Sequence, residues 1–253
     1  MSDVVVAGAA GRMGCRVIAC LADAPDLALV GALEAPGHAA LGRDAGEVAG
    51  IGRLGVPVTP APPALLTRDR ILVEFSVPEA TLEHLRIVAR GGGRAVIGTT
   101  GFTAPQREEI ARLAEKVPIL VSPNMSVGVN LAFKLLAQMA QTLGDEYDVE
   151  ITSAMRSAVL AGALGRDLSR VAVYGRQGTP GERTRDEIGL LSLRSGDVVG
   201  EHTVTFGNLG ERLELTHRAH SRDTFARGAI RAARFIAGAP PGLYSMQDVL
   251  GLK

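Results

Sequence analysis

The pattern of hydrophobic and polar positions divides the chain into two parts with different periodicities. In the first part, short apolar runs alternate with helix-like amphipathic stretches, which is typical of a parallel sheet with helical crossovers. The apolar runs lie at residues 4–7, 27–33, 71–75, 95–98 and 118–121. The helix-like stretches lie at residues 15–22, 80–90 and 104–116. This pattern predicts an α/β fold with a Rossmann-like parallel sheet.

The periodicity changes after residue 126. One long amphipathic helix is expected at residues 126–143, and a last long helix at 223–237. Between them, alternating runs predict strands at residues 147–152, 188–193, 198–206 and 213–217. Such runs predict an α+β domain with a mixed, mostly antiparallel sheet. We therefore expect a first domain over residues 1–126, completed by the C-terminal helices of 222–253, and a second over 127–221.

A glycine-rich turn joins the first predicted strand to the first helix. Gly11 and Gly14 occupy the second and third positions of a G-x-G-x-x-G pattern, while Ala9 occupies the first. A strand, a glycine turn and a helix in this order can place backbone amides around a pyrophosphate. We expect the cofactor phosphates to contact the residues of this turn: Gly8, Ala9, Ala10, Gly11, Arg12 and Met13. The alternative is a tight turn that binds no nucleotide.

Three further segments follow predicted strands and complete a dinucleotide site. Glu34 ends the second strand about twenty residues after the turn, where an acid binds the adenosine ribose. Two other loops are rich in small polar residues that suit a nicotinamide and its ribose: Gly98, Thr99 and Thr100, and Ser122, Pro123, Asn124 and Met125. Since the carboxyl ends of parallel strands meet at one edge, these loops are expected to converge with the glycine turn.

Composition excludes several classes of partner. The chain of 253 residues has 27 basic and 27 acidic side chains, so no net charge attracts it to nucleic acid or to an anionic membrane. Aromatic residues are only 4% and Trp is absent, which argues against a stacking surface for single strands. No apolar run would span a bilayer, and the first residues do not resemble a signal peptide. We expect a cytoplasmic protein, with Cys15 and Cys20 as buried thiols.

Candidates for proton transfer are few. His220, in the turn before the last long helix, is the best placed of the five histidines. His84 is expected to lie in solvent, and His202 and His217 on the surface of paired strands. Arg218 and Arg222 suit a substrate carboxylate or exposed ion pairs. No nucleophile–base constellation and no metal-ligand cluster is visible, so the catalytic residues remain unknown.

Five segments together resemble the dihydrodipicolinate reductase family. They are VAGAAGRMG (6–14), VIGTTGF (96–102), SPNMSVGVN (122–130), GDVVGEHTV (196–204) and SRDTFA (221–226). The resemblance implies reduction of a cyclic, small-molecule dicarboxylate to tetrahydrodipicolinate by NADH or NADPH, in lysine and diaminopimelate biosynthesis. It also implies a homotetramer and a second domain that serves substrate binding and oligomerisation. By the same resemblance, the residues named above would hold the cofactor.

The chain departs from the family pattern after Glu34. The family often has a basic residue there, which helps to hold the phosphate of NADPH, whereas Ala35 and Pro36 follow in this chain. An acid repels a 2′-phosphate, and Arg12 is the only nearby cation that would offset it. We therefore favour NADH.

A second departure follows Ala154. Members of the family carry a loop there with a histidine pair, a lysine and an Asp-Ala-Pro-Ser-Gly-Thr segment, which supplies the proton donor and binds the substrate carboxylates. About a dozen residues are absent from this chain. Three explanations are open: a segment omitted from the sequence as printed, an engineered deletion, or a natural paralogue. Without the loop we expect very low turnover. The alternatives are a non-catalytic NAD(P)-binding paralogue or scaffold, and an oxidoreductase that uses His220 on another substrate.

Overall fold

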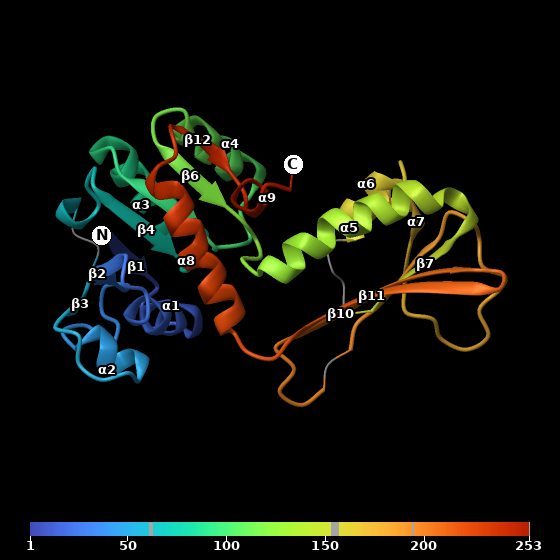
Figure 1. Cartoon of the computed structure of the whole chain (residues 1–253), viewed down its shortest axis with the longest axis horizontal. Coiled ribbons are helices and arrows are strands. Elements are labelled where there is room, and N and C mark those ends of the chain that lie inside the picture. The colour runs from blue at the N-terminus through green and yellow to red at the C-terminus, as the bar shows by residue number, and fades with distance from the viewer. Residues whose placement is uncertain (61–62, 153–156, 194, 253) are drawn as a thin grey trace. The chain divides into compact units, whose positions relative to one another are not determined.

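The computed structural model describes residues 1–60, 63–152, 157–193 and 195–252 (Figure 1). The chain forms two compact units: unit 1 comprises Met1–Val127 and Arg222–Lys253, and unit 2 comprises Gly128–Ser221. Each unit contains one sheet. The sequence position after Ala154, where the family loop is expected, falls among residues 153–156 and lies outside the described residues.

The sheet of unit 1 has the strand order β12-β6-β5-β4-β1-β2-β3, and its neighbouring strands are all parallel. The strands are β1 (Ser2–Ala7), β2 (Leu27–Leu33), β3 (Val58–Thr59), β4 (Arg70–Glu74), β5 (Arg94–Ile97), β6 (Pro118–Val121) and β12 (Gly242–Tyr244). The chain leaves β1 toward β2 and later returns to the other side of β1 as β4. Strand order therefore reverses at β1, and ligands of open α/β sheets bind beside such a point.

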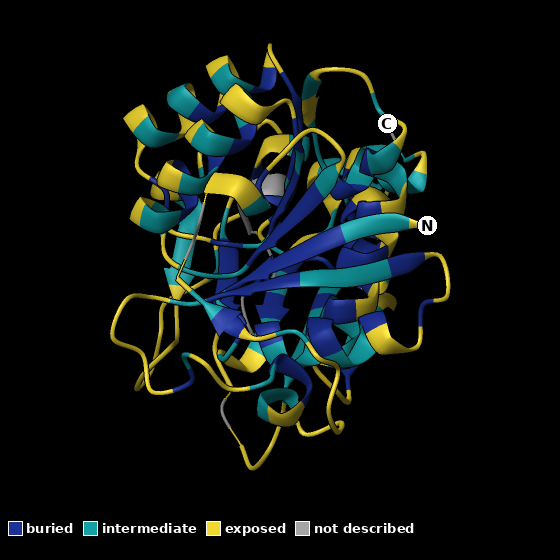
Figure 2. Ribbon diagram, turned by 90° about the vertical axis from the view of Figure 1, so that its left-hand side faces the viewer, coloured by how far each residue is buried: buried dark blue, intermediate teal, exposed yellow. Residues whose placement is uncertain are grey.

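Helices cover both faces of this sheet. They are α1 (Arg12–Ala22), α2 (Ala45–Ala49), α3 (Pro78–Gly91), α4 (Ala104–Ala114), α8 (Asp223–Ala237) and α9 (Met246–Leu250), with a 3₁₀ turn at Pro63–Leu65. Alternate residues of β1 enter two separate cores. Val4 and Val6 pack with residues of α1 and α8, whereas Val5 and Ala7 pack with residues of α3 and α4. The central strands β1, β4, β5 and β6 are accordingly buried along most of their length (Figure 2).

The helix starts of unit 1 follow the sequence signals. Thr103 caps α4 by accepting a hydrogen bond from the Gln106 amide, and the Gln106 side chain accepts one from the Thr103 amide. This reciprocal pair satisfies two of the amides that a helix start leaves without partners. Pro78 occupies the first turn of α3, where its fixed φ and lack of an N–H cost nothing.

Unit 2 contains a mixed sheet of order β11-β10-β7-β9-β8. Its elements are α5 (Val127–Leu143), a 3₁₀ turn (Gly144–Glu146), β7 (Asp148–Thr152), α6 (Ser157–Ala163), α7 (Leu168–Val171), β8 (Ala172–Tyr174), β9 (Ile188–Leu191), β10 (Gly200–Asn208) and β11 (Glu211–Ala219). The core joins the inner face of α5, including Phe133 and Leu136, to Ile151, Ile188 and Phe206 of the sheet. The predicted fold class is confirmed.

The differences from the predicted elements concern short segments. Strands β3, β8 and β12 have two or three residues each and were not expected. Strand β9 ends at Leu191, two residues before the predicted end, and β10 begins at Gly200 instead of 198. A strand of three residues carries too little alternation to be recognised from sequence. Among the described residues, no helix has the length and apolar character that crossing a bilayer requires.

Candidate functional site

The glycine turn is held by close backbone packing that side chains would prevent. Gly8 has a φ of +70°, and a Cβ added there would lie 2.7 Å from the Phe75 carbonyl oxygen. A Cβ on Gly14 would lie 2.1 Å from the Gly8 carbonyl oxygen. Both positions therefore require glycine: Gly8 for its left-handed backbone, and Gly14 for the approach of α1 to the turn.

The start of α1 offers backbone amides to an anion. Gly11 is the N-cap, and no side chain among the described residues forms a capping hydrogen bond there. The first turn contains no acidic residue that would repel a phosphate. Since the first amides of a helix lack intrahelical partners and the helix dipole favours negative charge, a pyrophosphate fits this turn.

Glu34 lies beside the glycine turn. Its carboxylate accepts hydrogen bonds of 3.0 Å from the Ala10 amide and of 3.0 Å from its neighbour, the Ala35 amide. The two bonds fix the carboxylate at the end of β2, one strand away from the turn on β1. Arg12, the cation expected to offset Glu34, is exposed. The structure thus brings the acid and the turn together.

The two loops predicted for the nicotinamide end follow β5 and β6, which are neighbours in the sheet. The Thr99 hydroxyl is buried 3.0 Å from the Thr81 hydroxyl, and the Ser122 hydroxyl donates to the Asn124 carbonyl oxygen at 2.7 Å. These hydroxyls are engaged within the protein. The loops therefore present backbone groups to a ligand, together with the exposed Thr100 and Pro123 and the partly exposed Asn124.

Helix α8 packs against the loop of residues 122–125. A Cβ on Gly228 would lie 1.8 Å from the Met125 carbonyl oxygen, so α8 contacts this loop backbone to backbone. Arg16 of α1 forms a two-pronged ion pair with Asp223 at the start of α8, with distances of 2.5 and 2.7 Å. Helices α1 and α8 are thereby joined beside the cofactor edge.

Sequence reasoning missed the β4–α3 loop, residues 75–77. Phe75 donates its amide hydrogen to the Ala7 carbonyl oxygen, and its own carbonyl lies against Gly8. A Cβ on Gly98 would lie 2.1 Å from the Phe75 ring, so the ring rests on the backbone of the next loop. The β4–α3 loop therefore separates the glycine turn from the Gly98 loop. The available signal was the acid Glu74 at the end of an apolar strand.

The prediction that His84 lies in solvent was wrong. Its side chain is 12% exposed, and its Nδ1 lies 2.6 Å from a carboxylate oxygen of Glu74, which is fully buried. His84 occupies the face of α3 that packs toward the sheet, beside the buried Thr81 and Leu85. A polar residue between apolar ones on a helix gives no sign of its buried partner, because that partner lies on another element.

The other predicted candidates are exposed or lie on β10 and β11. His220 and Arg222 are exposed, and Arg218 forms an ion pair of 2.7 Å with Glu201. His202 and His217 face each other across β10 and β11 with ring centres 6.1 Å apart. Burial, and secondarily the nearby His202, lowers the pKa of His217.

The two cysteines were expected to be buried, and both are partly buried, in environments that do not favour a thiolate. Burial is the main cause that raises the pKa of both Cys15 and Cys20, which keeps the thiols protonated. Within the described ranges, no group of His, Cys, Asp and Glu side chains could hold a metal ion.

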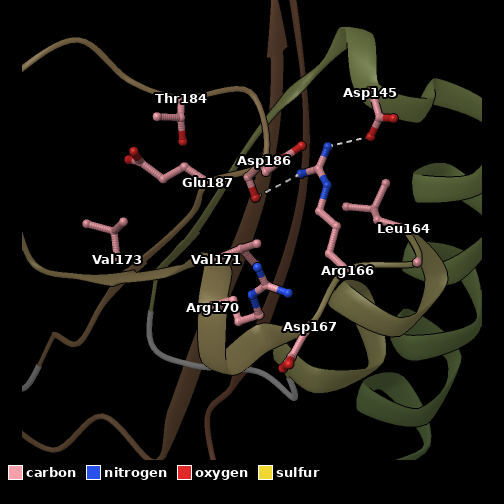
Figure 3. Close-up of a pocket in the computed structure, with 11 residues that line it drawn as sticks. Asp145, Leu164, Arg166, Asp167, Arg170, Val171, Val173, Thr184, Asp186 and Glu187 are labelled. Carbon is pink, nitrogen blue, oxygen red and sulfur yellow. Dashed lines mark hydrogen bonds and ion pairs between the residues drawn. The ribbon is translucent and has the colours of Figure 1, made fainter.

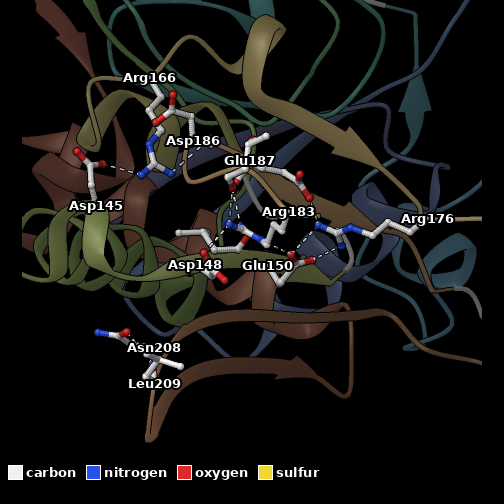
Figure 4. Close-up of polar contacts among 12 residues, drawn as sticks. Asp145, Asp148, Glu150, Arg166, Arg176, Arg183, Asp186, Glu187, Asn208 and Leu209 are labelled. Carbon is white, nitrogen blue, oxygen red and sulfur yellow. Dashed lines mark hydrogen bonds and ion pairs between the residues drawn. The ribbon is translucent and has the colours of Figure 1, made fainter. Parts of the chain in front are cut away.

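Unit 2 has an open pocket of about 660 Å³ that is lined by charged side chains (Figure 3). Arg166 points across it and pairs with Asp145 at 2.6 Å. Beside it, Arg183 and Arg176 bind the carboxylates of Glu150 and Glu187 (Figure 4). Because these charges compensate one another, we interpret the region as an ion-pair network that supports the sheet.

Comparison with known proteins decides the family. Residues 2–125 match the model of the dihydrodipicolinate reductase N-terminus, and residues 128–250 match that of the C-terminus. The chain belongs to the dihydrodipicolinate reductase family. It is 48% identical to the 4-hydroxy-tetrahydrodipicolinate reductase of Citrifermentans bemidjiense and 47% identical to that of Geobacter sulfurreducens, over the full length of each chain. Both alignments extend over 267 positions, 14 more than the 253 residues of this chain.

Solved structures support the fold. A dipicolinate-bound dihydrodipicolinate reductase from Paenisporosarcina sp. TG-14 superposes with a TM-score of 0.74 at 20% identity, covering 98% of both chains. An amine dehydrogenase from Mycobacterium smegmatis gives a TM-score of 0.62 at 17% identity, covering 97% of this chain and 95% of its own. The family prediction is confirmed, and with it an oxidoreductase with a nicotinamide cofactor.

Proposed function

We propose that this member of the dihydrodipicolinate reductase family reduces 4-hydroxy-tetrahydrodipicolinate to tetrahydrodipicolinate in lysine and diaminopimelate biosynthesis, in the cytoplasm. The observation that carries the proposal is the identity of 48% over the whole length of a relative with that name. In this proposal, the glycine turn, Glu34 and the two loops that follow β5 and β6 form the cofactor site that such a reaction needs. A bound reduced nicotinamide would supply the hydride.

The residues present fit a dinucleotide. Residues 8–13 and the first amides of α1 would bind the pyrophosphate, since Gly8 and Gly14 leave room for a backbone approach. Glu34, held by the Ala10 amide, would exchange this bond for the ribose hydroxyls or share it with them. Residues 98–100 and 122–125 would contact the nicotinamide end through their backbone groups.

We favour NADH over NADPH. The Glu34 carboxylate is fixed in place, and the next two residues, Ala35 and Pro36, carry no positive charge. A 2′-phosphate beside this carboxylate would experience repulsion between two anions at close range. Arg12, on the exposed start of α1, is the cation that would partly offset this repulsion.

We further propose that this chain is impaired in catalysis, because the family's donor loop is absent after Ala154. The alignment with its relative extends over 14 more positions than this chain has residues, which supports such a deletion. Hydride transfer needs a matching protonation, and a positioned general acid contributes about 10²–10⁴-fold to a rate. The same observation favours a second candidate: a paralogue that binds NAD(P) without catalysis.

We also propose a homotetramer assembled through unit 2. The face of β11 that bears Arg212, Glu214, Thr216 and Arg218 is exposed, and Tyr174 and Leu193 are large exposed side chains of the same unit. Light scattering after gel filtration would give the mass of the assembly. A monomeric mass would contradict this part of the proposal.

One assay separates the proposed function from its alternative. The purified protein, whose intact mass should be 26.4 kDa, is titrated with NADH and then supplied with the cyclic substrate. We expect saturable NADH binding and a turnover about 10²–10⁴-fold below that of a relative that has the loop. Ordinary turnover would refute the impairment, whereas binding with no detectable turnover would favour the paralogue. A mass more than a kilodalton higher would show that the loop is present.

A further inference from the structure

Glu74 is a buried carboxylate at the centre of the parallel sheet. It ends β4, where it pairs with Ala7 of β1 on one side and Ile97 of β5 on the other. Its side chain is fully buried. A buried carboxylate is tolerated only when hydrogen bonds replace its lost hydration. Glu74 has two such bonds, and each leads to a different part of the site.

The first bond holds the β4–α3 loop. One Glu74 carboxylate oxygen accepts a hydrogen bond of 3.1 Å from the Ser76 amide. The loop is only three residues long and lies with the Phe75 ring on Gly98 and the Phe75 carbonyl on Gly8. Fixing the Ser76 amide therefore fixes a segment that touches both the glycine turn and the Gly98 loop.

The second bond connects this carboxylate to α3. The other Glu74 oxygen lies 2.6 Å from Nδ1 of His84, whose ring is mostly buried. One helical turn earlier, the Thr81 hydroxyl donates to the Val77 carbonyl oxygen at 2.9 Å and lies 3.0 Å from the Thr99 hydroxyl. Two polar side chains on one face of α3 thus join the loops that follow β4 and β5. Neither side chain is explained by packing alone.

We propose that the Glu74–His84 pair is a positioning unit that holds the β4–α3 loop and the Gly98 loop in place for the nicotinamide end of the cofactor. The proposal rests on the cofactor site proposed above. His84 acts through Glu74 and the Ser76 amide and does not contact the cofactor itself. The adenosine end is held by different elements, since Glu34 is fixed by the Ala10 amide.

Because the two ends of the cofactor are assigned to different elements, a ligand that lacks the nicotinamide tests the proposal. ADP-ribose shares the adenosine, the pyrophosphate and a ribose with NADH but lacks the nicotinamide. Substituting His84→Leu leaves the Glu74 carboxylate without its imidazole partner. We expect the NADH dissociation constant of the full-length protein to rise about tenfold or more, the size of losing one hydrogen bond to a charged group. The dissociation constant for ADP-ribose should stay within about twofold.

Two further variants sharpen the result. His84→Asn places an amide nitrogen near the position of Nδ1. This variant should therefore bind NADH much more tightly than His84→Leu does, with an affinity close to that of the unaltered protein. Arg86→Gln removes the ion pair between Arg86 and Glu109, with distances of 2.7 and 2.9 Å, from the exposed face of the same helix. This matched control should alter neither dissociation constant.

The NADH and ADP-ribose dissociation constants together decide whether the Glu74–His84 pair has this positioning role. Unchanged NADH affinity in His84→Leu would overturn the positioning role. An equal loss for NADH and ADP-ribose would overturn it too, because the pair would then act on the glycine turn or on the fold as a whole and not on the nicotinamide end. If the unaltered protein binds neither ligand, this inference and the proposed function both fail. If it binds NADH and never reduces the substrate, only the catalytic part of the proposed function fails, and the binding test of His84 still stands.

Discussion

Unit 1 and unit 2 differ in how much of their chemistry is fixed by the backbone. In unit 1 both faces of the sheet are buried, and the loops at its carboxyl edge contact one another through glycines, carbonyls and amides. In unit 2, α5 contributes to one core, whereas charged side chains line the pocket of Figure 3 and form the network of Figure 4. A site made of backbone groups is specified by short local motifs of the sequence. A site made of side chains on a loop, as proposed for the donor loop, would be lost together with that loop.

The largest effect is expected from inserting the proposed donor loop into unit 2. A variant that carries the loop of a relative between Ala154 and Met155 should gain about 10²–10⁴-fold in kcat, because a general acid becomes available. The dissociation constant for NADH should not change, since the glycine turn is untouched. Steady-state kinetics and cofactor titration measure the two quantities.

The same loop with its histidines and lysine replaced by alanine is the matched control, and it should give no gain. An equal gain from this control would show that the loop acts by completing the structure of unit 2, and the contrast between the units would then fail.

The next effect concerns the backbone packing of unit 1. In Gly14→Val, the new Cβ would lie 2.1 Å from the Gly8 carbonyl oxygen, far closer than two such atoms can approach. Helix α1 must then move away from the glycine turn, at a cost of about 1–3 kcal/mol or more. We expect NADH affinity to fall at least about 100-fold. Isothermal titration and a denaturant unfolding curve measure the two changes.

A glycine of unit 2 provides the control. Gly162 lies within α6, and a Cβ there would meet nothing within 4 Å. Gly162→Ala should therefore leave NADH affinity unchanged and stabilise the protein by up to about 1 kcal/mol through helix propensity. If both glycine variants weakened NADH binding equally, the special role of the turn would be refuted.

The parts of the molecule that sequence predicts well are those with local causes. Val4 to Ala7 alternate between two cores, and Thr103 caps α4 through residues three positions apart, so short windows contain the whole signal. The glycine turn is predictable for the same reason.

The parts that sequence did not predict depend on distant partners. The burial of His84 depends on Glu74, ten residues earlier and on another element. Strand β12 exists because Leu243 pairs with Ile119, more than a hundred residues away. A three-residue segment has no periodicity of its own, and only the partner strand makes it a strand. The geometry of the glycine turn was therefore accessible to sequence reasoning, whereas the contact between Glu74 and His84 was not.

A smaller effect is expected from the ion-pair network of unit 2. The Arg183 guanidinium donates to Asp148 at 2.6 Å and to the Glu187 and Val149 carbonyl oxygens at 2.6 and 3.1 Å. Arg183→Gln leaves these acceptors without their partner, and a destabilisation of about 1–3 kcal/mol is expected, confined to unit 2. Hydrogen exchange resolved by peptide would show faster exchange in β7 and β9.

The control is Arg212→Gln in the same unit, which breaks an exposed ion pair of 3.0 Å with Glu214. Exposed pairs contribute about 0–1 kcal/mol, so little change is expected. Faster exchange in β1 or β4 of the Arg183 variant would contradict the view that the two units are stabilised separately.

The smallest expected effect is a difference between the two units in how their stability depends on pH. The pKa of His217 in the folded protein is lowered, first by burial and then by the nearby His202, whose ring lies 6.1 Å away across the β10–β11 pair. The unfolded chain therefore binds a proton more readily than the folded one. The resulting stabilisation is complete above the ordinary histidine pKa of 6.5 and is lost as the pH falls through the lowered value.

Acidification from neutral pH should consequently loosen β10 and β11 before the sheet of unit 1. Peptide-resolved hydrogen exchange, corrected for its intrinsic pH dependence, would detect the difference, and His217→Gln should remove it. Equal loosening in the variant would assign the pH dependence to other groups, and the two units would then respond to acid through a common cause.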